Sequence, residues 1–277
     1  MWTEEELDFE ITKEKVAEMQ LHLIKQLYPD GFFDRISNFD YGFHVTVVAA
    51  TPLPQHLVYL GMHQCYSTEA VAWSSKLTES ECGQIDVKRL LEGGKGHYSP
   101  YEHASITFVI EGVNHGTLQQ LLRSRIGVSP SVQSFRYTSN HILEAASGER
   151  DIEKVVYIRP PGTYHDRESG IYSYDPSTRA EDLSLCSFLV KHVAKRLKNG
   201  MPPEQARGQL PFDYRQNAII TYNARSLMGF FDRRSKRDAQ NEIQILTKLL
   251  MEKFICWVPE TAEYYMKNRA GKALLSP

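Results

Sequence analysis

Three arginines, Arg123, Arg125 and Arg136, lie in a part of the sequence that has no acidic residue between Glu111 and Glu144. The planar guanidinium offers a fork of hydrogen-bond donors, which suits phosphate groups and the carbonyl edges of heterocycles. A solvated basic loop would account for a single Arg-x-Arg pair. The acid-free surroundings instead favour a binding site for an anion.

A second basic cluster spans residues 223–237, and Arg207 stands alone between the two clusters. The simplest alternative for the second cluster is an exposed helix face. Two arginine clusters that are poor in acid, together with Arg207, favour a polyanionic ligand held by distant parts of the chain.

The hydrophobic periodicity predicts the helices and strands that position these clusters. Residues 116–125 are expected to end an amphipathic helix, residues 127–131 to form a loop, and residues 135–138 to begin a strand. Further strands are predicted at residues 42–50, 104–110, 155–158 and 217–222. Further helices are predicted at residues 3–27, 55–66, 86–92, 178–199, 202–207 and about 239–254. Residues 162–175 are rich in tyrosine, glycine and charge and are expected to form a surface loop or lid.

The composition is that of a soluble globular protein, with 277 residues of which 42% are hydrophobic and 24% are charged. A net charge of −2 argues against general binding to nucleic acid or anionic membranes, so a basic site must be local. The acidic N-terminus lacks the features of a signal peptide, and no apolar run has the length of a membrane span. We therefore expect a cytoplasmic protein without nucleic-acid or membrane partners.

The cysteine and histidine patterns argue against metal binding. The four cysteines form no Cys-x-x-Cys pair, so we expect reduced thiols, each a small buried apolar group: Cys65, Cys82, Cys186 and Cys256. His97 and His103 do not form His-Glu-x-x-His, and no third ligand is apparent. The glycine run at residues 93–96 lacks the P-loop pattern and is expected to stop a helix, and the Ser-Pro-x-Glu run after it has the form of a capping box.

Several motifs stand in the order found in flavin-dependent thymidylate synthases, and the chain from about residue 45 to residue 259 resembles that family. The motifs are His97-x-Ser-Pro-Tyr-Glu-His103, Arg123-x-Arg125 with Ser134-x-Arg-Tyr137, Ala206-Arg-x-x-Leu-Pro211, and Asn223-Ala-Arg-Ser-Leu followed by Arg234 and Ala239-Gln240. The resemblance implies an α/β (α+β) catalytic domain at residues 43–277, with a central mixed sheet flanked by helices. It leaves an N-terminal helical extension at residues 1–42.

The resemblance also implies an activity and a set of site residues. It implies a methyltransferase that converts dUMP to dTMP in a homotetramer with shared active sites. Methylenetetrahydrofolate would supply the methylene group, reduced FAD the hydride, and NADPH would re-reduce the flavin. The implied FAD contacts are Ser67, Ser99, Glu102, Arg123, Ser124, Arg125, Ile126, Asn223, Arg225 and Gly229. The implied dUMP contacts are Gln120, Arg123, Gln133, Ser134, Phe135, Arg136, Tyr137, Arg207 and Arg234.

Two residues receive catalytic roles from the resemblance. Arg234 resembles the residue that activates the uracil, and His97 would line the substrate side of the pocket. The chemistry of uracil agrees: C5 becomes nucleophilic when negative charge develops across N3 and O4, and a guanidinium aimed there stabilises that charge. No protein nucleophile is required, and none of the four cysteines has the Pro-Cys-His context of the ordinary thymidylate synthase.

Four positions depart from the family pattern. Ser124 replaces the histidine of Arg-His-Arg, and Val132 stands where a glutamate is usual. Gly229 and Asp238 occupy positions where an asparagine and a histidine often contact flavin. Two alternatives therefore stand beside dTMP synthesis. One is another C5-modified product, such as a 5-hydroxymethyl pyrimidine nucleotide, and the other is a nucleotide- or flavin-binding protein without turnover.

Overall fold

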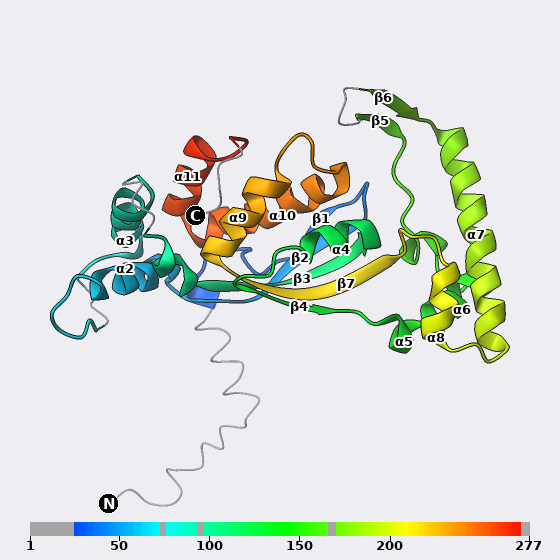
Figure 1. Ribbon diagram of the computed structural model, residues 1–277, viewed down its shortest axis with the longest axis horizontal. Helices are drawn as coiled ribbons and strands as arrows, with labels where there is room; N and C mark the ends of the chain where they lie inside the picture. Colours follow the sequence, from blue (N-terminus) through cyan, green and yellow to red (C-terminus); the bar gives the residue numbers. More distant parts are fainter. Residues whose placement is uncertain (1–24, 73–75, 93–96, 166–169, 273–277) are drawn as a thin grey trace, which may run out of the picture.

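A five-stranded antiparallel sheet forms the centre of the molecule, with the strand order β1-β2-β3-β7-β4 (Figure 1). The computed structural model describes residues 25–72, 76–92, 97–165 and 170–272. The strands of the sheet are β1 Ile36–Asn38, β2 Phe43–Ala50, β3 Ser105–Asn114, β4 Val128–Val132 and β7 Arg215–Asn223. β3 and β7 share the longest ladder, in which the hydroxyls of Thr107 and Thr221 are hydrogen-bonded at 2.9 Å.

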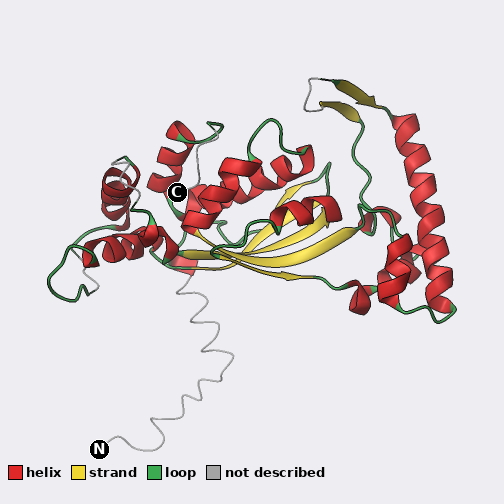
Figure 2. Ribbon diagram, viewed as in Figure 1, coloured by secondary structure: helices red, strands yellow, loops and turns green. Residues whose placement is uncertain are grey.

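The two faces of the sheet differ in burial. In β7, Ala218, Ile220 and Tyr222 are buried, whereas Asn217 and Ile219 are exposed on the opposite face. This alternation follows from the two-residue period of a strand, which sends neighbouring side chains to opposite faces. Helices cover the buried face (Figure 2). They are α4 His115–Leu121, α9 Ala224–Arg234, α10 Asn241–Trp257 and α11 Pro259–Asn268.

The main core fixes α9 against α10 and α11. Phe231 of α9 packs edge-on against Phe254 with ring centroids 5.4 Å apart. Next to it, the buried carboxylate of Asp232 pairs with Arg269 at 2.6 Å and accepts a hydrogen bond from Tyr265 at 3.0 Å. A buried ion pair of this kind is costly to break because it leaves one charge without a partner. The orientation of α9 is therefore set by packing and by a paired charge.

A second, smaller core lies at the end of the sheet that is farthest from α2 and α3 (Figure 1). The long helix α7, Pro176–Lys198, begins where the Asp175 side chain accepts a hydrogen bond from Thr178 N, and it packs Val190 and Val193 inward. Its neighbours are α5 Phe135–Thr138, α6 Asn140–Ser147, η4 Ile152–Lys154, α8 Pro203–Ala206 and η5 Arg207–Gln209. The hairpin β5 Gly162–His165 and β6 Ile171–Tyr174 precedes α7. At the other end of the sheet lie α2 Pro54–Gln64, α3 Glu79–Asp86, η2 Val87–Leu91 and η3 Ser99–Glu102.

The predicted fold class, a central sheet flanked by helices, is confirmed, but the expected mixed sheet is antiparallel throughout the described residues. The reason is visible between β2 and β3. Ala50 at the end of β2 pairs with Ile106 at the start of β3, so the chain between them leaves and re-enters the sheet at one end. A parallel pair would need a crossover to the opposite end.

Most of the predicted elements are confirmed. The strands predicted at residues 42–50, 104–110 and 217–222 are β2, β3 and β7, and the helices predicted at residues 55–66, 178–199 and 239–254 are α2, α7 and α10. The helix predicted at residues 86–92 begins earlier, because the capping box of Thr78 and Glu81 starts α3, and it ends as the π-helix η2. The helix predicted at residues 3–27 lies almost entirely outside the described residues.

Other local predictions are wrong. The strand predicted to start at residue 135 is the helical turn α5, and the loop predicted at residues 127–131 is largely the strand β4. β4 pairs with β7 alone, and an edge strand tolerates the proline that suggested a loop. Residues 155–158 form only an isolated bridge, from Val156 to Tyr214, and the predicted loop at residues 162–175 contains the hairpin β5–β6. Cys65 and Cys256 are exposed rather than buried.

Candidate active site

The segment that follows α4, residues 122–127, lies along α9 and is hydrogen-bonded to it near the end and near the start of that helix. Near the end of α9, Arg233 Nη2 donates to Ser124 Oγ at 2.8 Å. Near its start, Ser226 Oγ donates to the carbonyl oxygen of Ile126 at 2.6 Å, and Asn223 N donates to that of Gly127 at 3.0 Å. These contacts place Ser124 and Ile126, both predicted to contact flavin, against the same helix as Asn223.

Gly127 makes the close approach possible. Its φ is +64°, and a Cβ at this position would lie 2.2 Å from Asn223 Nδ2 and 2.3 Å from Ser226 Oγ. Only glycine combines this backbone angle with so little space. Asn223 in turn caps α9, since its Oδ1 accepts a hydrogen bond from Ser226 N at 2.8 Å.

Arg234 lies at the end of α9 and is held by Gln120 of α4. Its Nη2 donates to the main-chain oxygen of Gln120 at 2.9 Å and its Nη1 to Gln120 Oε1 at 3.3 Å. Burial lowers the pKa of Arg234, and the positive charges of Arg233 and Arg123 lower it further. Its Nε is buried and has no hydrogen-bond partner in the described part of the chain. The guanidinium is therefore fixed on one side and keeps an unfilled donor.

The charge of this arginine cluster is not neutralised. Among the described residues, no carboxylate forms an ion pair with Arg123, Arg233 or Arg234. Three guanidinium groups without a counter-charge attract an anion, and more strongly where one of them is partly shielded from water. The contacts join Gln120 to Arg234 and Ser124 to Arg233, and the charge of Arg123 acts on Arg234. That these residues form one ligand site stays a prediction.

A second group of predicted residues gathers at the start of α9. Arg225 pairs with Glu102 at 2.6 Å, which connects α9 to η3, the 3₁₀ helix that begins at Ser99. The ring of His97 lies 6.0 Å from that of Tyr66, the neighbour of Ser67, and His97 Nε2 is buried without a partner within the described ranges. At 1.5 Å per residue, α9 separates Arg225 from Arg233 by about 12 Å. The remaining predicted flavin contacts on these elements are Arg125, which is exposed, and Gly229, which is buried inside α9.

The remaining predicted substrate contacts lie at the far end of β4. Val128 pairs with Tyr222 at one end of the strand and Val132 with Ala218 at the other, a span of about 14 Å at 3.4 Å per residue. Beyond that end follow Gln133, Ser134, Phe135, Arg136 and Tyr137, and Arg207 lies nearby in η5. A single chain thus does not bring this group, which includes Arg207, to Arg234.

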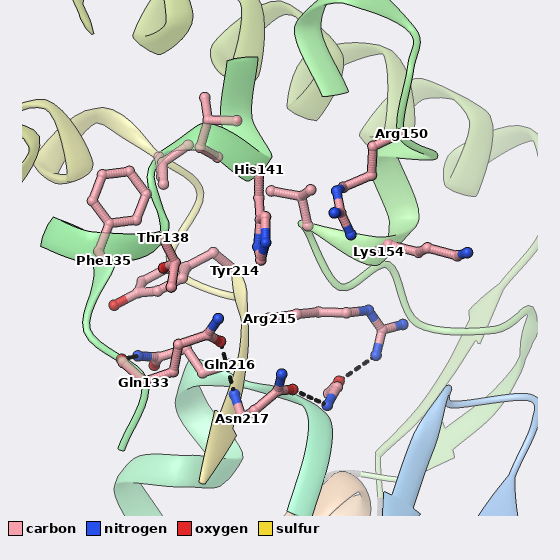
Figure 3. Close-up of a pocket in the computed structure, with 14 residues that line it drawn as sticks. Gln133, Phe135, Thr138, His141, Arg150, Lys154, Tyr214, Arg215, Gln216 and Asn217 are labelled. Atoms are coloured by element: carbon pink, nitrogen blue, oxygen red, sulfur yellow. Dashed lines mark hydrogen bonds between the residues drawn. The ribbon is translucent and has the colours of Figure 1, made fainter. Parts of the chain in front are cut away.

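A pocket beside Gln133 and Phe135 is lined by three basic side chains (Figure 3). One of them, Arg215, uses its donors on main-chain oxygens: it donates to Glu153 O at 2.6 Å and to Tyr41 O at 2.9 Å. The second, Arg150, is paired with Glu144 at 2.7 Å. The third is Lys154. Arg150 has a carboxylate partner, whereas Arg123, Arg233 and Arg234 have none among the described residues, so the cluster at Arg234 is the stronger candidate anion site.

Three polar residues near Arg234 have no role assigned from the sequence: Arg233, Gln240 and Glu242. Arg233 belongs to the second basic cluster and Gln240 to a quoted motif, so both carried a signal. Glu242 sits two residues beyond Gln240 at the start of α10, where an acid is expected simply to complement the helix dipole. Only its burial, with 2% of the residue exposed, distinguishes Glu242 from an ordinary acidic residue at a helix start.

The described residues restrict the kinds of site that the chain offers. They include no group of three or more His, Cys, Asp or Glu side chains suited to holding a metal ion. None of their helices is long and apolar enough to cross a membrane. An antiparallel sheet covered by helices, with an arginine cluster along α9, defines an α+β protein with a candidate anion-binding site.

The comparisons with known proteins assign this fold to a family. The family model for the thymidylate synthase complementing protein matches residues 46–260. A flavin-dependent thymidylate synthase of Haloarcula marismortui is 31% identical over 245 residues, which cover 82% of this chain and 97% of that protein. One from Halobacterium salinarum is 37% identical over 188 residues, which cover 64% of this chain and 75% of that protein. The chain belongs to the flavin-dependent thymidylate synthase family and is an enzyme of that family.

Two solved structures share the fold. The UMP/dUMP methylase PolB of Streptomyces cacaoi, bound with 5-Br UMP, has a TM-score of 0.61 and 18% identity, and the match covers 85% of this chain and 97% of that one. The flavin-dependent thymidylate synthase of Helicobacter pylori, complexed with FAD and dUMP, has a TM-score of 0.60 and 20% identity, and the match covers 82% and 99% of the two chains. Both support the sheet and helix arrangement described above.

Proposed function

We propose that this protein methylates dUMP at C5 to give dTMP. Methylenetetrahydrofolate would supply the methylene group, reduced FAD the hydride, and NADPH would reduce the flavin. Family membership supports the reaction, and a relative with this fold binds FAD and dUMP. The observation that carries the proposal is the guanidinium of Arg234, oriented by Gln120 and surrounded by cations without a carboxylate partner.

Arg234 would activate the uracil electrostatically. Negative charge on N3 and O4 makes C5 nucleophilic, and a guanidinium that already points at these atoms stabilises the charge without first reorienting. The Gln120 oxygens hold one side of the guanidinium, and no carboxylate of the described residues pairs with its charge, which would be met by the ligand. Burial and the charges of Arg233 and Arg123 lower the pKa of Arg234, so an anionic ligand would be stabilised beside it. An arginine nevertheless remains protonated throughout the physiological range.

The residues along α9 fit a dinucleotide cofactor. FAD, when bound, supplies the hydride that completes the methyl group. Exposed Arg123 and Arg125 would meet its diphosphate, and exposed Ile126 with Asn223 at the start of α9 would contact the rest of the cofactor. Arg225 already shares its charge with Glu102, so it suits a neutral part of the cofactor better than a phosphate.

The separation between Arg207 and Arg234 favours an active site shared between subunits. We propose a homotetramer in which residues 133–137 and Arg207 of one copy complete the arginine cluster of another. The exposed apolar side chains of Ile219 on the open sheet face, and of Leu185 and Phe188 on α7, would be covered in such an assembly. We further propose a cytoplasmic location, and a catalytic domain at residues 43–277 to whose central sheet the extension at residues 1–42 adds the strand β1.

The spectrum of the purified protein, titrated with dUMP, tests the proposed function. We expect flavin absorbance and, after reduction, a reoxidation that depends on dUMP and methylenetetrahydrofolate and yields dTMP by mass spectrometry. A flavin-free protein that cannot be reconstituted with FAD would contradict the proposal. Tight dUMP binding without any flavin cycle would instead indicate a binding protein.

A second candidate reaction is favoured by position 124. Ser124 stands where the family has a histidine, and its hydroxyl is already engaged by Arg233. A hydroxyl in place of an imidazole changes the surroundings in which the C5 substituent is completed. The alternative product is another C5-modified pyrimidine nucleotide, for example the 5-hydroxymethyl form. The mass of the product distinguishes it from dTMP.

A further inference from the structure

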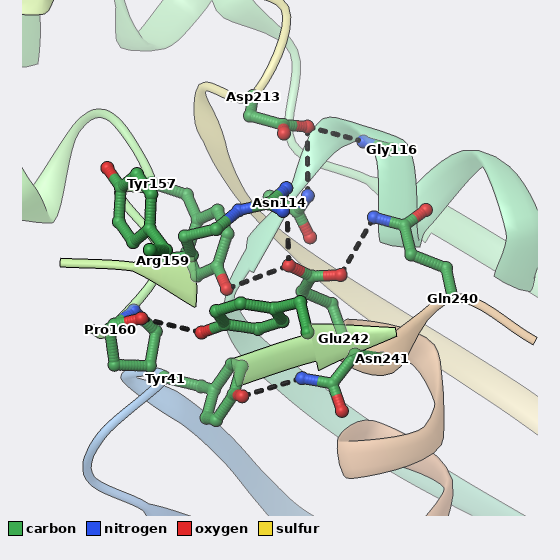
Figure 4. Close-up of polar contacts among 12 residues, drawn as sticks. Tyr41, Asn114, Gly116, Tyr157, Arg159, Pro160, Asp213, Gln240, Asn241 and Glu242 are labelled. Carbon is green, nitrogen blue, oxygen red and sulfur yellow. Dashed lines mark hydrogen bonds and ion pairs between the residues drawn. The ribbon is translucent and has the colours of Figure 1, made fainter. Parts of the chain in front are cut away.

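A chain of hydrogen bonds connects Arg234 to a buried carboxylate in α10. Arg234 donates to Gln120, and Gln120 Nε2 donates to Gln240 Oε1 at 2.6 Å. Gln240 Nε2 then donates to Glu242 Oε2 at 2.9 Å (Figure 4). Every donor along the chain points from Arg234 towards Glu242.

The chemistry of the end group fixes this direction. An ionised carboxylate only accepts hydrogen bonds, so the Gln240 amide must turn its NH₂ group to Glu242 and its oxygen to Gln120. The Gln120 amide must then present its NH₂ group to Gln240. Its Oε1 is left to face Arg234, which itself has only donors. Arg234, which only donates, and Glu242, which only accepts, thus determine together how the amides of Gln120 and Gln240 are oriented between them.

The carboxylate of Glu242, which ends the hydrogen-bond chain, is itself held in place by burial and by its own partners. It is 2% exposed, and its Oε1 accepts a hydrogen bond from the Tyr157 hydroxyl at 3.1 Å (Figure 4). Arg159 Nη2 lies 3.7 Å from the same oxygen. A buried carboxylate persists when it is paired and hydrogen-bonded, and Glu242 has both kinds of partner.

We propose that Glu242 is a positioning residue for Arg234, acting through the amides of Gln240 and Gln120. This inference rests on the proposed role of Arg234 in activating the nucleotide. Glu242 orients the Gln120 side chain so that its Oε1, beside the main-chain oxygen of the same residue, faces the guanidinium, which keeps Arg234 aimed before the ligand arrives. Because the effect is on the aim of Arg234, it acts on the chemical step more than on binding of dUMP.

The substitution Glu242→Gln tests the relay with little change in shape. Its amide can donate to Gln240, so only Arg234 still favours this direction and Gln120 is held less strictly with its Oε1 toward the guanidinium. We expect kcat to fall about 10-fold to 100-fold, by analogy with the range found when a residue that orients a metal ligand is removed, with KM for dUMP changing much less. The matched control is Glu111→Gln, which changes a carboxylate of the partly exposed pair with Arg35 and should leave kcat unaltered.

A double-variant cycle separates positioning from general stabilisation. If Glu242 acts through Gln120, then Glu242→Gln should cost nothing further in a Gln120→Ala background. Losses that multiply in the double variant would overturn the proposal. Gln240→Met is a second variant, which breaks the relay while Glu242 keeps its contacts with Tyr157 and Arg159, and it should reproduce the loss of kcat.

An NMR measurement on the resting protein tests the relay without any turnover of dUMP. The ¹⁵N resonance of the Arg234 guanidinium, identified by its absence in Arg234→Lys, should shift in Glu242→Gln but not in Glu111→Gln. If the wild-type protein makes no dTMP, the proposed function fails while this shift still supports the relay. If the wild type is active and neither kcat nor the resonance responds to Glu242→Gln, the relay is wrong.

Discussion

Arg233 donates a hydrogen bond from Nη2 to the hydroxyl oxygen of Ser124 over 2.8 Å. The bond joins the last turn of α9 to the segment that follows α4, one residue away from Arg234. Ser124 is 8% exposed whereas Arg233 is exposed, so the contact is partly shielded from water. Serine thus offers an acceptor to one member of the arginine cluster, which a protonated imidazole could not do.

The first prediction concerns this contact. Ser124→Ala removes the acceptor of the partly buried hydrogen bond from Arg233 and should destabilise the protein by about 1 kcal/mol. This change lowers Tm by about 2–4 °C for a chain of this size. Thermal unfolding at one pH measures the change. Ser147→Ala, at an exposed position of α6, is the control and should not lower Tm. Equal Tm values for all three proteins would mean that the Arg233 contact contributes nothing.

Removal of Arg234 should have the largest effect on activity. Arg234→Ala deletes the guanidinium held by Gln120 and should lower kcat by about 10²–10³-fold, as loss of one aimed donor does in other active sites. The fold and bound FAD should be retained. Arg237→Ala changes an exposed arginine of the same basic cluster and should keep nearly full turnover. The rate of dTMP formation at steady state measures the effect. Normal turnover of Arg234→Ala would refute the proposal that Arg234 activates the uracil.

Gly127 should be intolerant of any side chain. In Gly127→Ala the new methyl group would lie 2.2 Å from Asn223 Nδ2, so Asn223 and the cap of α9 must move. We expect weaker FAD binding, at least about tenfold, along with a loss of stability. Gly148→Ala is the matched control, because Gly148 also has a positive φ, +86°, but open space around its Cβ. Equal FAD affinities in the two variants, measured by flavin fluorescence, would contradict the predicted clash.

Asp86 should make stability fall as pH rises. Its side chain is fully buried, and neither oxygen has a hydrogen-bond partner within the described residues. Burial raises the pKa of Asp86 to about 9, and the charge of Glu79 adds to this shift. The folded state therefore keeps a proton that the unfolded chain releases above a pH of about 4. The resulting stability is complete below that pH and is lost as pH rises toward 9, at up to about 1.4 kcal/mol per pH unit.

Comparing the wild type with Asp86→Asn isolates this effect, because asparagine does not ionise. Urea unfolding at pH 6 and pH 8.5 should show a loss of stability in the wild type that is markedly smaller in the variant. Absolute stability of the variant also reflects its buried amide, so the difference between the two pH values is the quantity to compare. Parallel pH profiles would show that Asp86 does not carry the extra proton.

The sequence predicted the central elements well because their burial patterns are regular. β2, β3 and β7 alternate between buried and exposed residues, and α7 and α10 carry helical apolar spacing. β4 and α5 were misassigned because tertiary contacts decide them. Pro130 suggests a turn until β7 provides a partner strand, and Phe135 suggests a strand until the second core draws it into a helical turn.

The candidate site was predicted unevenly for a similar reason. The family resemblance implied one ligand site for Gln120, Arg123 and Arg234, and that site stays a prediction, although Gln120 does contact Arg234. No periodicity reveals that Gln240 and Glu242 lie behind them, because the link is a side-chain path between α4 and α10. Nor does sequence order reveal that β4 keeps Arg207 away from Arg234 within one chain.

The borders of the central sheet have a consequence for how copies of this chain can meet. β4, at one border, contains Pro130, and β1, at the other, is three residues long. Proline contributes no amide hydrogen, so neither border presents a continuous ladder to an incoming strand. The sheet is thereby protected against fibril-like growth. Neighbouring copies must recognise each other through side chains rather than by extending the backbone ladder.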